Sequence, residues 1–370
     1  MENKTPSKPN LVVCFRAQPV EDRLVARIDE AWSSSVNIIN VGQSEVADAL
    51  LQADYFCGHA KVPVDWDRVV AQKRLQWIQS SAAGMDWCLV PSVIESDITV
   101  TTAAGVLSDQ VAEHGLALIL AWGRNLRSFI YDQRVESGNP DYRKFKRKPT
   151  FDLVGKTVGI VGFGGVGRRF SEVVAPFAGR ILAVDLFPTN KPERVAELWG
   201  PERLDDLLAE SDVVFLSLPL NAETRGTFDA AKFATMKKGA LLANLARGPL
   251  VDHDALVDAL RSERLGGYVA DVTSPEPLPP DHPLWDFDSV IITPHVAGQI
   301  GWRFDDICDI YCENVRRFRA GEPLINKLSY QGKKWGFPLR DGTVPLWIDV
   351  KSVYSTRRPI VREKYDFNRF

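Results

Sequence analysis

The sequence lacks a hydrophobic run long enough to cross a membrane. Its longest apolar stretch, Leu116–Trp122, is far shorter than the roughly 20 residues that a membrane-spanning helix needs. The polar amino terminus, Met1–Asn10, leads into the apolar run Leu11–Phe15, which is too short for the core of a signal peptide. These absences predict a cytoplasmic protein without a membrane partner.

The sequence also has few cysteines and little net charge. A net charge of −3 over 370 residues indicates neither a nucleic-acid-binding surface nor an acidic disordered chain. The five cysteines contain no C-x-x-C pair, so no disulfide framework is expected in a chain that can build its own core. Cys308 and Cys312 stand one helical turn apart, which suits a metal site. No histidine or third cysteine is near them in sequence, so buried thiols are the favoured interpretation and no metal is predicted.

Short apolar runs that alternate with helix-like segments make up most of the first hundred residues. Strands are expected at 11–15, 36–41, 53–57 and 75–79, and helices at 21–32 and 45–52. This alternation is typical of a parallel sheet flanked by helices. The 370 residues, of which 45% are hydrophobic, suffice for two domains of ordinary size.

The middle of the chain combines one long helix with a second series of strands. The helix is predicted over 107–135, and its stretch Gly115–Trp122 is apolar on most sides, so we expect it to be buried between domains or subunits. Strands are then expected at 157–161, 181–184, 213–218, 240–245, 268–272 and 290–293. Strands that are apolar throughout are covered on both faces, and their order and spacing predict a second, doubly wound α/β unit.

The segment Gly162-Phe-Gly164-Gly-Val-Gly167 matches the G-x-G-x-x-G pattern of dinucleotide-binding loops. It follows the strand 157–161 and opens a helix over 165–174, which is the context the pattern requires. Gly162 permits the tight turn, Gly164 lets the backbone approach a pyrophosphate, and Gly167 lets helix and strand pack closely. A glycine turn without a ligand is the less favoured interpretation.

Asp185 stands about twenty residues beyond the glycine loop, at the end of the next expected strand. Its carboxylate can accept hydrogen bonds from an adenosine ribose and would repel a 2′-phosphate, so NAD is favoured over NADP. Lys191 and Arg194 are close by in sequence and would soften that preference. The amino terminus of the helix offers unpaired N–H groups to the phosphates.

Three polar segments follow expected strands on their carboxyl side, where ligands of open α/β sheets bind. They are Asn244–Asp252 with Arg247, Asp271–Leu278 with Glu276, and Thr293–Gly298 with His295. Together with the glycine loop and with the segments Gln79–Asp86, Val111–Leu118 and Leu218–Thr224, they resemble the D-2-hydroxy acid dehydrogenases. The resemblance extends over most of the chain from Leu11 to about Leu328.

This resemblance implies an α/β protein of two Rossmann-like doubly wound domains. A flavodoxin-like substrate-binding domain would be discontinuous, formed by 1–104 and 298–330, and an NAD-binding Rossmann domain would occupy 105–297. The resemblance further implies a homodimer formed through a helical arm around 112–129, NAD as cofactor, and a small 2-oxo or 2-hydroxy acid as substrate. Residues 331–370 would be a carboxyl-terminal extension beyond the usual end of the family.

Individual binding residues are also implied by the resemblance. The loop with Ala83, Gly84 and Met85 would bind the substrate carboxylate through backbone N–H groups, and Asp271 would face the nicotinamide carboxamide. The remaining cofactor contacts implied by the resemblance are Pro219 and Thr224, along the adenosine, together with Val166, Leu218 and Ala246.

The residue types of the three polar segments suit reduction of a 2-oxo acid. Arg247 can hold the carboxylate with its planar fork and polarise the carbonyl oxygen. His295 can donate a proton to that oxygen during reduction or remove it during oxidation. Glu276 beside it would fix the orientation of the imidazole and raise its pKa. Taken singly, the three could be a surface arginine, a solvated loop charge and a turn histidine; their joint order favours an active site.

The other histidines are weaker candidates. His114, at a helix start, and His253, in an Asp-rich turn, are expected to be structural. His59 and Arg303 are minor candidates for a substrate contact. The family often has a tryptophan shortly before the glycine-loop strand, and this chain has none there.

The substrate and the regulatory alternative stay open at the level of sequence. Glyoxylate, hydroxypyruvate and longer 2-oxo acids fit the same catalytic residues, whereas 3-phosphoglycerate is less expected because no regulatory domain follows. The alternative is an NAD-sensing regulatory protein of the corepressor type, on the same fold. The tail Lys333–Phe370 has no clear helical or strand period, and its aromatic residues suggest that it packs over a partner subunit or a cleft entrance.

Overall fold

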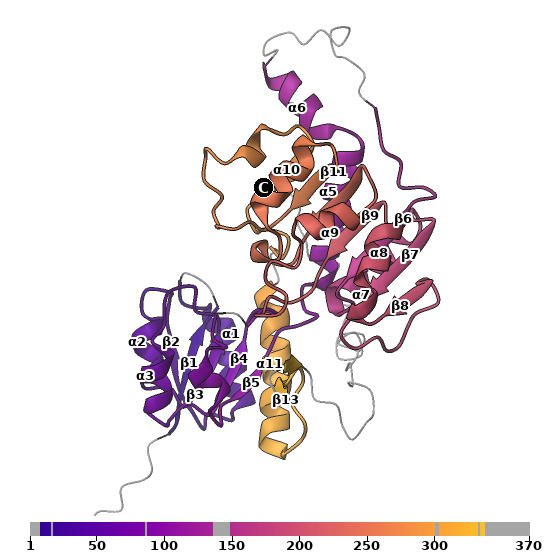
Figure 1. Cartoon of the computed structure of the whole chain (residues 1–370). Helices are drawn as coiled ribbons and strands as arrows, with labels where there is room; N and C mark the ends of the chain where they lie inside the picture. The colour runs from indigo at the N-terminus through magenta and orange to yellow at the C-terminus, as the bar shows by residue number, and fades with distance from the viewer. Residues whose placement is uncertain are drawn as a thin grey trace, which may run out of the picture. The chain divides into compact units, whose positions relative to one another are not determined.

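The computed structural model describes residues 8–15, 18–85, 87–135, 149–299, 303–331 and 334–336. The chain divides into two compact units. Unit 1 consists of Met1–Val106 and Trp302–Phe370, and unit 2 of Leu107–Gly301. Each unit contains its own parallel sheet, which Figure 1 shows with its labelled elements. The structure therefore has the predicted α/β class, with two doubly wound sheets.

Unit 1 contains a five-stranded parallel sheet with the strand order β2-β1-β3-β4-β5. Its strands are β1 (Asn10–Cys14), β2 (Asn37–Asn40), β3 (Tyr55–Gly58), β4 (Trp77–Ser80) and β5 (Thr99–Thr101). The order 2-1-3-4-5 is the doubly wound order of flavodoxin-like sheets. The short strand β5 was not expected from the sequence, because three residues carry too little periodicity to stand out.

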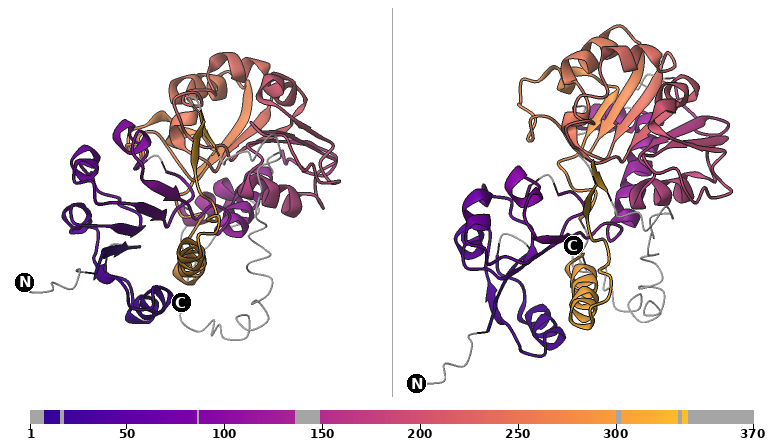
Figure 2. Two further views of the ribbon diagram at one scale, coloured as in Figure 1. Left: turned by 90° about the horizontal axis from the view of Figure 1, so that it is seen from below. Right: turned by 60° about the horizontal axis from the view of Figure 1, so that its bottom comes forward.

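Helices cover both faces of the unit 1 sheet. They are α1 (Asp22–Ala31), α2 (Val46–Leu50), α3 (Trp66–Ala71), α4 (Pro91–Ile94) and α11 (Arg303–Ala320). The last of these comes from the far end of the chain and packs beside α1, and it lies with the amino-terminal elements in both views of Figure 2. Trp32 of this region donates its indole N–H to the Tyr311 hydroxyl at 3.0 Å, and Trp77 stacks on Phe318.

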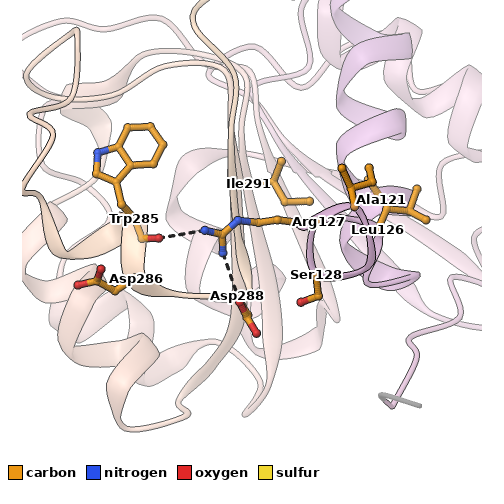
Figure 3. A pocket seen from close by; sticks show the side chains of 9 residues that line it. Ala121, Leu126, Arg127, Ser128, Trp285, Asp286, Asp288 and Ile291 are labelled. Carbon is orange, nitrogen blue, oxygen red and sulfur yellow. Dashed lines mark hydrogen bonds and ion pairs between the residues drawn. The ribbon is translucent and has the colours of Figure 1, made fainter. Parts of the chain in front are cut away.

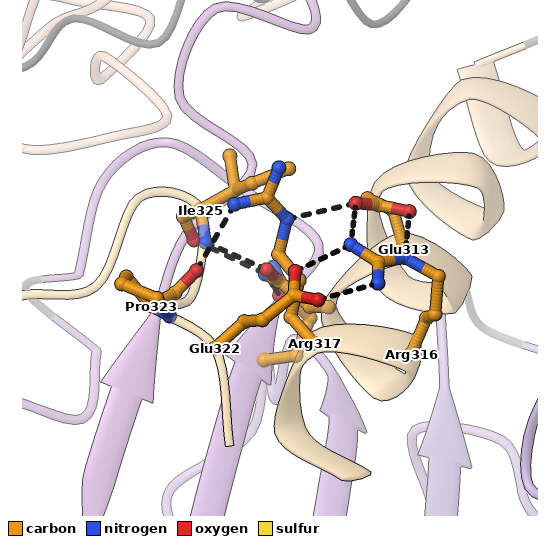
Figure 4. Close-up of polar contacts among 8 residues, drawn as sticks. Glu313, Arg316, Arg317, Glu322, Pro323 and Ile325 are labelled. Carbon is orange, nitrogen blue, oxygen red and sulfur yellow. Dashed lines mark hydrogen bonds and ion pairs between the residues drawn. The ribbon is translucent and has the colours of Figure 1, made fainter. Parts of the chain in front are cut away.

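The carboxyl end of α11 is tied down by charges and by one buried amide. Arg316 forms ion pairs with Glu313 and with Glu322, which lies beyond the helix end (Figure 4). Asn314, fully buried, accepts a hydrogen bond from the Ile325 N–H at 2.7 Å and donates one to the Ile325 carbonyl. A buried amide satisfied on both sides fixes the segment that follows the helix. After it, β13 (Ser329–Gln331) pairs antiparallel with β14 (Lys334–Gly336).

Unit 2 contains a seven-stranded parallel sheet with the order β12-β11-β10-β9-β6-β7-β8. Its strands are β6 (Thr157–Val161), β7 (Arg180–Val184), β8 (Glu197–Trp199), β9 (Val213–Leu216), β10 (Ala240–Asn244), β11 (Leu265–Ala270) and β12 (Val290–Ile292). Its helices are α5 (Ser108–Gly123), α6 (Leu126–Val135), α7 (Gly165–Val174), α8 (Leu204–Glu210), α9 (Ala230–Thr235) and α10 (His253–Arg261), with short 3-10 turns at Pro201–Arg203, Gly248–Leu250 and Pro283–Asp286.

Successive residues of these strands enter two different cores. Val158 and Ile160 of β6 pack with Phe170 of α7 and with residues of α5 on one face. Val161 belongs to the core of the other face, beside α8, α9 and α10. Because side chains alternate along a strand, a strand that is buried on both faces must be apolar throughout. The continuous apolar runs of the sequence follow from this arrangement.

The structure corrects two expectations drawn from the sequence. The single helix predicted over 107–135 is two helices, α5 and α6, separated at Arg124 and Asn125. Asn125 has a positive φ of 55°, and its amide donates to the Pro149 carbonyl at 2.7 Å, so a left-handed residue ends α5. The tail was expected to lack strand structure, yet its first residues form β14. Residues 337–370, including Phe337 and Trp347, lie outside the described residues.

None of the five cysteines, all of which lie in the described part of the chain, forms a disulfide. The Sγ atoms of Cys308 and Cys312 are 3.8 Å apart on α11, and the hydrogen bond between them, together with burial, raises the pKa of the Cys308 thiol. Across the described residues, no helix is both long enough and apolar enough to traverse a lipid bilayer.

Candidate active site

Five neighbouring strands of unit 2 end in the loops that carry the predicted site residues. In the order β12-β11-β10-β9-β6, these strands are followed by His295, by Asp271 and Glu276, by Arg247, by Leu218 and by Gly162. All five strands are parallel, so their carboxyl ends meet at one edge of the sheet. The chain order reverses between β9 and β6, and such a switch point is where open α/β sheets bind ligands.

The glycine loop between β6 and α7 has the geometry of a dinucleotide cradle. Gly162 has φ of +91°, and a methyl group at this position would come within 2.6 Å of the Leu218 N–H nitrogen. A methyl group on Gly167 would overlap the Gly162 carbonyl, so α7 can begin this close to β6 only with glycine there. Gly164 precedes the first turn of the ten-residue helix α7 and provides no side-chain cap. The N–H groups of that turn suit a phosphate, so these residues fit a dinucleotide.

Asp185 follows β7 and fastens the glycine loop. Its Oδ2 accepts a hydrogen bond from the Phe163 N–H at 2.6 Å, and its Oδ1 accepts one from the Phe187 N–H at 2.9 Å. The carboxylate is half-buried at the end of its strand. Backbone contacts thus orient the group that the sequence assigns to the cofactor.

The loop Leu218–Thr224 is stiffened by its own polar side chains. The Thr224 hydroxyl donates to the Pro219 carbonyl at 2.8 Å and accepts a hydrogen bond from the Asn221 N–H at 2.8 Å. The Asn221 side chain accepts from the N–H groups of Glu223 and Thr224. Such local bonds hold a loop in one conformation without a covering element.

Arg247 follows β10 and is half-buried. Its guanidinium donates to the Ala246 carbonyl at 2.7 Å. The buried Asn244 side chain fixes this turn, since its oxygen accepts from the Ala246 N–H and its nitrogen donates to the Arg247 carbonyl. A rigid turn therefore presents the arginine at the strand edge.

Gly248 brings the loops of Arg247 and Glu276 together. A methyl group on Gly248 would overlap the carbonyl of Thr273, which precedes Glu276 by three residues. The Thr273 N–H in turn donates to Glu276 Oε2 at 3.3 Å. The close approach of these two backbones therefore sets the spacing between the two loops.

Glu276 and His295 form a hydrogen-bonded pair. The distance between Glu276 Oε1 and His295 Nδ1 is 2.7 Å, and the two side chains are 43% and 49% exposed. A carboxylate can only accept, so Nδ1 carries a proton and Nε2 is the ring nitrogen left to exchange a proton with a ligand. His295 has a positive φ of 55°, a conformation that a non-glycine residue rarely adopts outside turns.

Asp271 follows β11 and is 2% exposed. Its Oδ1 accepts hydrogen bonds from the Thr293 hydroxyl at 2.6 Å and from the Val296 N–H at 2.9 Å, and its Oδ2 accepts from the Ala297 N–H at 2.8 Å. The two N–H groups flank His295 on its carboxyl side. The sequence did not reveal this contact, because nothing in the spacing of Asp271 and His295 shows which backbone groups the carboxylate meets.

Comparison with known proteins identifies the group to which this architecture belongs. Residues 116–297 match the NAD-binding domain of the D-isomer specific 2-hydroxyacid dehydrogenases. The glyoxylate reductase of Thermofilum pendens is 35% identical over 270 residues, which cover 71% of this chain and 78% of that protein. The chain belongs to the D-isomer specific 2-hydroxyacid dehydrogenase family.

Solved structures of family relatives carry different dinucleotides. A D-isomer specific 2-hydroxyacid dehydrogenase from Xanthobacter autotrophicus, in complex with NADPH and MES, is 26% identical with a TM-score of 0.68, and the match covers 87% of this chain and 98% of that one. The NAD-dependent formate dehydrogenase of Staphylococcus aureus, in complex with NAD, is 26% identical with a TM-score of 0.69, and the match covers 87% of this chain and all of that one.

Of the remaining predicted residues, Val166 of α7 lies in unit 2, where it packs against the core around Phe170, and the residues of the loop 83–85, His59 and Arg303 lie in unit 1. Ala83 is exposed, Gly84 is half-buried, and the Met85 side chain is packed in the unit 1 core. The His59 ring stacks on Trp87 with centroids 4.8 Å apart. Asp86 and the side chain of Arg303 lie outside the described residues.

The two histidines expected to be structural both lie in unit 2. Burial lowers the pKa of His253 to about 4, and the neighbouring His282 contributes in the same direction. His114 of α5 instead contacts Thr293, beside the loop of His295, with 2.8 Å between its Nε2 and the Thr293 hydroxyl.

A separate pocket of about 660 Å³ lies at the junction of α5 and α6. It is lined by Ala121, Leu126, Arg127, Ser128, Ile130, Trp285, Asp286, Asp288 and Ile291 (Figure 3). Arg127 donates to the Trp285 carbonyl at 2.9 Å and so ties α6 to this segment. The pocket contains none of the predicted catalytic residues, and three of its lining side chains are large, apolar and exposed: Leu126, Ile130 and Trp285.

Proposed function

We propose that the protein is an NAD-dependent D-2-hydroxyacid dehydrogenase that works as a reductase of small 2-oxo acids. Arg247, Glu276 and His295 form its catalytic set. The observation that carries the proposal is the Glu276–His295 pair at 2.7 Å, placed at the same sheet edge as Arg247 and the glycine loop. The glyoxylate reductase relative, 35% identical, supports the same chemical class.

The residues of the site suit each part of the reaction. Bound NADH supplies a hydride to the carbonyl carbon of the 2-oxo acid. Arg247 binds the substrate carboxylate and polarises the carbonyl oxygen. His295 gives its Nε2 proton to that oxygen, so a hydroxyl forms, and Glu276 stabilises the orientation of the ring throughout. Proton transfer from a positioned side chain typically contributes about 10²–10⁴-fold to the rate.

NAD rather than NADP is the proposed cofactor. Asp185 would repel a 2′-phosphate at the ribose position. The basic side chains nearby are engaged elsewhere: Lys191 donates to the Val195 and Ala196 carbonyls, and Arg194 binds Ser171 and Glu172. Because Lys191 and Arg194 are held by these contacts in the described structure, they are less available to bind the 2′-phosphate of NADP than their positions in the sequence suggest.

Unit 1 is the proposed substrate-binding domain, and unit 2 the NAD-binding domain. The backbone N–H groups of Ala83, Gly84 and Met85 are the proposed second contact for the substrate carboxylate. The loop that carries them is anchored in unit 1, where the Ala82 carbonyl accepts the Ala103 N–H at 3.0 Å. Residues 331–370 remain a proposed extension to the substrate-binding domain.

A homodimer formed through the helical arm is the proposed assembly. The exposed apolar side chains of Leu126, Ile130 and Trp285, at 45%, 52% and 40% exposure, gather around the pocket of Figure 3. An apolar surface of this kind is typical of a contact with another protein surface. A second copy of the chain is the occupant that we propose, because the arm around 112–129, through which the family resemblance predicts a dimer, extends into the first residues of α6.

The first experiment is a turnover assay of the purified protein with NADH and with NADPH. The acids tested are glyoxylate, hydroxypyruvate, pyruvate, phenylpyruvate and 2-oxoisocaproate. We expect turnover with NADH to exceed turnover with NADPH, and kcat to fall about 10²–10⁴-fold in His295→Ala. Arg247→Ala is expected to lower kcat/KM for the acid, since both the carboxylate contact and the carbonyl polarisation are lost.

The control for the histidine variant is His282→Ala. His282 is half-buried, its Nδ1 accepts the Leu284 N–H at 3.2 Å, and its ring lies beside that of His253. The control variant should keep wild-type kcat. Tight NADH binding with no turnover of any acid would contradict the reductase proposal and favour an NAD-sensing regulatory protein.

A further inference from the structure

A chain of hydrogen bonds joins helix α5 to the loop of His295. His114 lies on α5, with 2.8 Å between its Nε2 and the Thr293 hydroxyl oxygen. That hydroxyl is in turn 2.6 Å from Asp271 Oδ1, and the His114 Nε2 is 3.7 Å from the same carboxylate oxygen. All three residues belong to unit 2.

The direction of each hydrogen bond follows from the donors available. Asp271 acts as the acceptor of the two backbone N–H groups of Val296 and Ala297, so the single Thr293 hydroxyl proton points to its carboxylate at 2.6 Å. The hydroxyl oxygen then has only lone pairs to offer His114. His114 therefore donates from Nε2, and the bonds run from His114 through Thr293 to Asp271.

The close packing of α5 against the sheet brings His114 to this place. A methyl group on the neighbouring Gly115 would come within 2.6 Å of the Phe215 ring of β9. Further along the helix, a methyl group on Gly267 of β11 would overlap the Trp122 side chain. Glycines on α5 and on β11 thus let the helix approach the sheet closely. The half-buried His114 can therefore reach the end of β12.

The series of hydrogen bonds from His114 ends at the backbone around His295. The left-handed conformation of His295 is unfavourable for a residue with a Cβ. Asp271 offsets this cost by binding the next two N–H groups of the chain, and the His295 N–H itself donates to the Thr293 carbonyl at 3.0 Å. A strained residue persists when the surrounding contacts over-determine it.

We propose that His114 is a positioning residue for the proton-transferring His295. Through Thr293 it orients the Asp271 carboxylate, and Asp271 holds the turn that presents the His295 ring to Glu276 and to substrate. The catalytic part of this inference rests on the proposed function. The structural part, that His114 stabilises the turn at Val296 and Ala297, stands on the contacts alone.

Two substitutions separate the hydrogen bond from the packing of the ring. His114→Gln places an amide N–H near the position of Nε2 and keeps a donor to Thr293. His114→Leu fills similar space and removes the donor. We expect kcat to fall about 10- to 100-fold in His114→Leu, because a misplacement of about 1 Å in a catalytic group can lower the rate about 10²-fold. His114→Gln should recover most of the lost kcat.

A double-mutant cycle tests whether the effect passes through His295. In a His295→Gln background, His114→Leu should lower the residual rate less than twofold, because the residue that it positions is already gone. Equal fold-losses in the two backgrounds would contradict the proposal. Glu113→Gln, an exposed neighbour on α5, is the matched control and should match the wild type in every readout.

Hydrogen exchange provides a readout that needs no turnover. The amides of Val296 and Ala297 should exchange faster in His114→Leu than in the wild type and in His114→Gln, at an unchanged thermal midpoint. Unchanged exchange would overturn the proposal whatever the kinetics. Faster exchange with a wild-type kcat would overturn the positioning role. A wild type that turns over no acid would instead contradict the proposed function. The exchange experiment would then still test whether His114 stabilises the turn at Val296 and Ala297.

Discussion

At the scale of single residues, the candidate site contains unusual backbone conformations and one deeply buried carboxylate. His295 has a positive φ, and Gly162 does as well, and each stands directly at a loop of the candidate site. Asp271 is buried at 2% exposure with three donors on its carboxylate. Buried carboxylates persist when their acceptor sites are filled in this way. A left-handed residue and a buried carboxylate therefore meet at the loop of His295.

His253 gives a prediction about the pH dependence of stability. Burial lowers its pKa to about 4 in the folded protein, whereas a histidine in the unfolded chain titrates near 6.5. Below pH 6.5 the unfolded state therefore binds a proton that the folded state does not. The free energy of unfolding should fall as pH drops from about 6.5 to about 4, by about 3 kcal/mol from this group.

The measurement is denaturant unfolding of the wild type and of His253→Gln at several pH values from 7.5 to 4. The variant lacks the imidazole, so its unfolding free energy should fall less steeply over this interval, and the two curves should converge or cross as pH falls. Above pH 7 their difference should not depend on pH. Parallel curves over the whole range would show that His253 titrates normally.

At the scale of elements, the candidate site depends on how closely neighbouring loops approach. Gly248 lies against the Thr273 carbonyl, so the turn after β10 and the loop after β11 touch through their backbones. These loops carry Arg247 and Glu276. The helix break at Asn125 is a second such feature, since it turns α6 away from the line of α5 and produces the pocket of Figure 3.

Gly248→Ala should separate these two loops. The added methyl group cannot share space with a backbone carbonyl, so the loops must move apart. We expect kcat/KM for the acid to fall at least about tenfold, and the free energy of unfolding to fall by about 1–3 kcal/mol. Steady-state kinetics and denaturant unfolding measure the two effects.

The matched control is Gly266→Ala. Gly266 lies at the amino end of β11, opposite to the site, and a methyl group there would overlap the Gly239 carbonyl. It should lower stability by a similar amount while kcat/KM stays within about twofold of wild type. Equal kinetic losses in both variants would mean that general destabilisation, and not loop spacing, explains the result.

At the scale of the whole molecule, two parallel sheets divide the chain into units with different proposed tasks. Unit 2 alone contains the glycine loop, Arg247, Glu276 and His295. Unit 1 is closed by α11, which returns from the carboxyl-terminal part of the chain and forms ion pairs with α1. The exposed apolar surface at α6 is the proposed contact between two copies of the chain.

Ile130→Glu should disrupt the proposed homodimer. Ile130 is 52% exposed on α6 beside the pocket, and a charge buried there in a contact between copies would lose its hydration. We expect light scattering with size-exclusion chromatography to give a dimer mass for the wild type and a monomer mass for the variant.

Val154→Glu is the control for this experiment. Val154 is also exposed and apolar, at 75% exposure, but it does not line the pocket. It should leave the mass unchanged. A wild type that is monomeric at micromolar concentration would contradict the dimer, and a dimeric Ile130→Glu would place the interface elsewhere.

Much of the fold and of the candidate site could be predicted from the sequence, because the physical requirements are local. A strand buried on both faces must be apolar at every position, so β6, β9 and β10 stand out in the chain. The glycines of the loop 162–167 are required by a positive φ and by backbone contact. Parallel strands end at one edge, so residues that follow successive strands, such as Arg247 and His295, could be expected to meet there.

The sequence by itself determined the α/β class, the glycine loop and the position of Arg247, Glu276 and His295 after successive strands. Only the tertiary structure decided that α5 ends at Gly123, ahead of the left-handed Asn125, and that His114 reaches Thr293, 179 positions away in the chain. A hydrogen bond between distant elements depends on which face of a helix packs on which strand end. The periodicity of apolar residues shows that one face of a helix is buried. Which residues of other elements that face contacts depends on how the helix packs on the sheet.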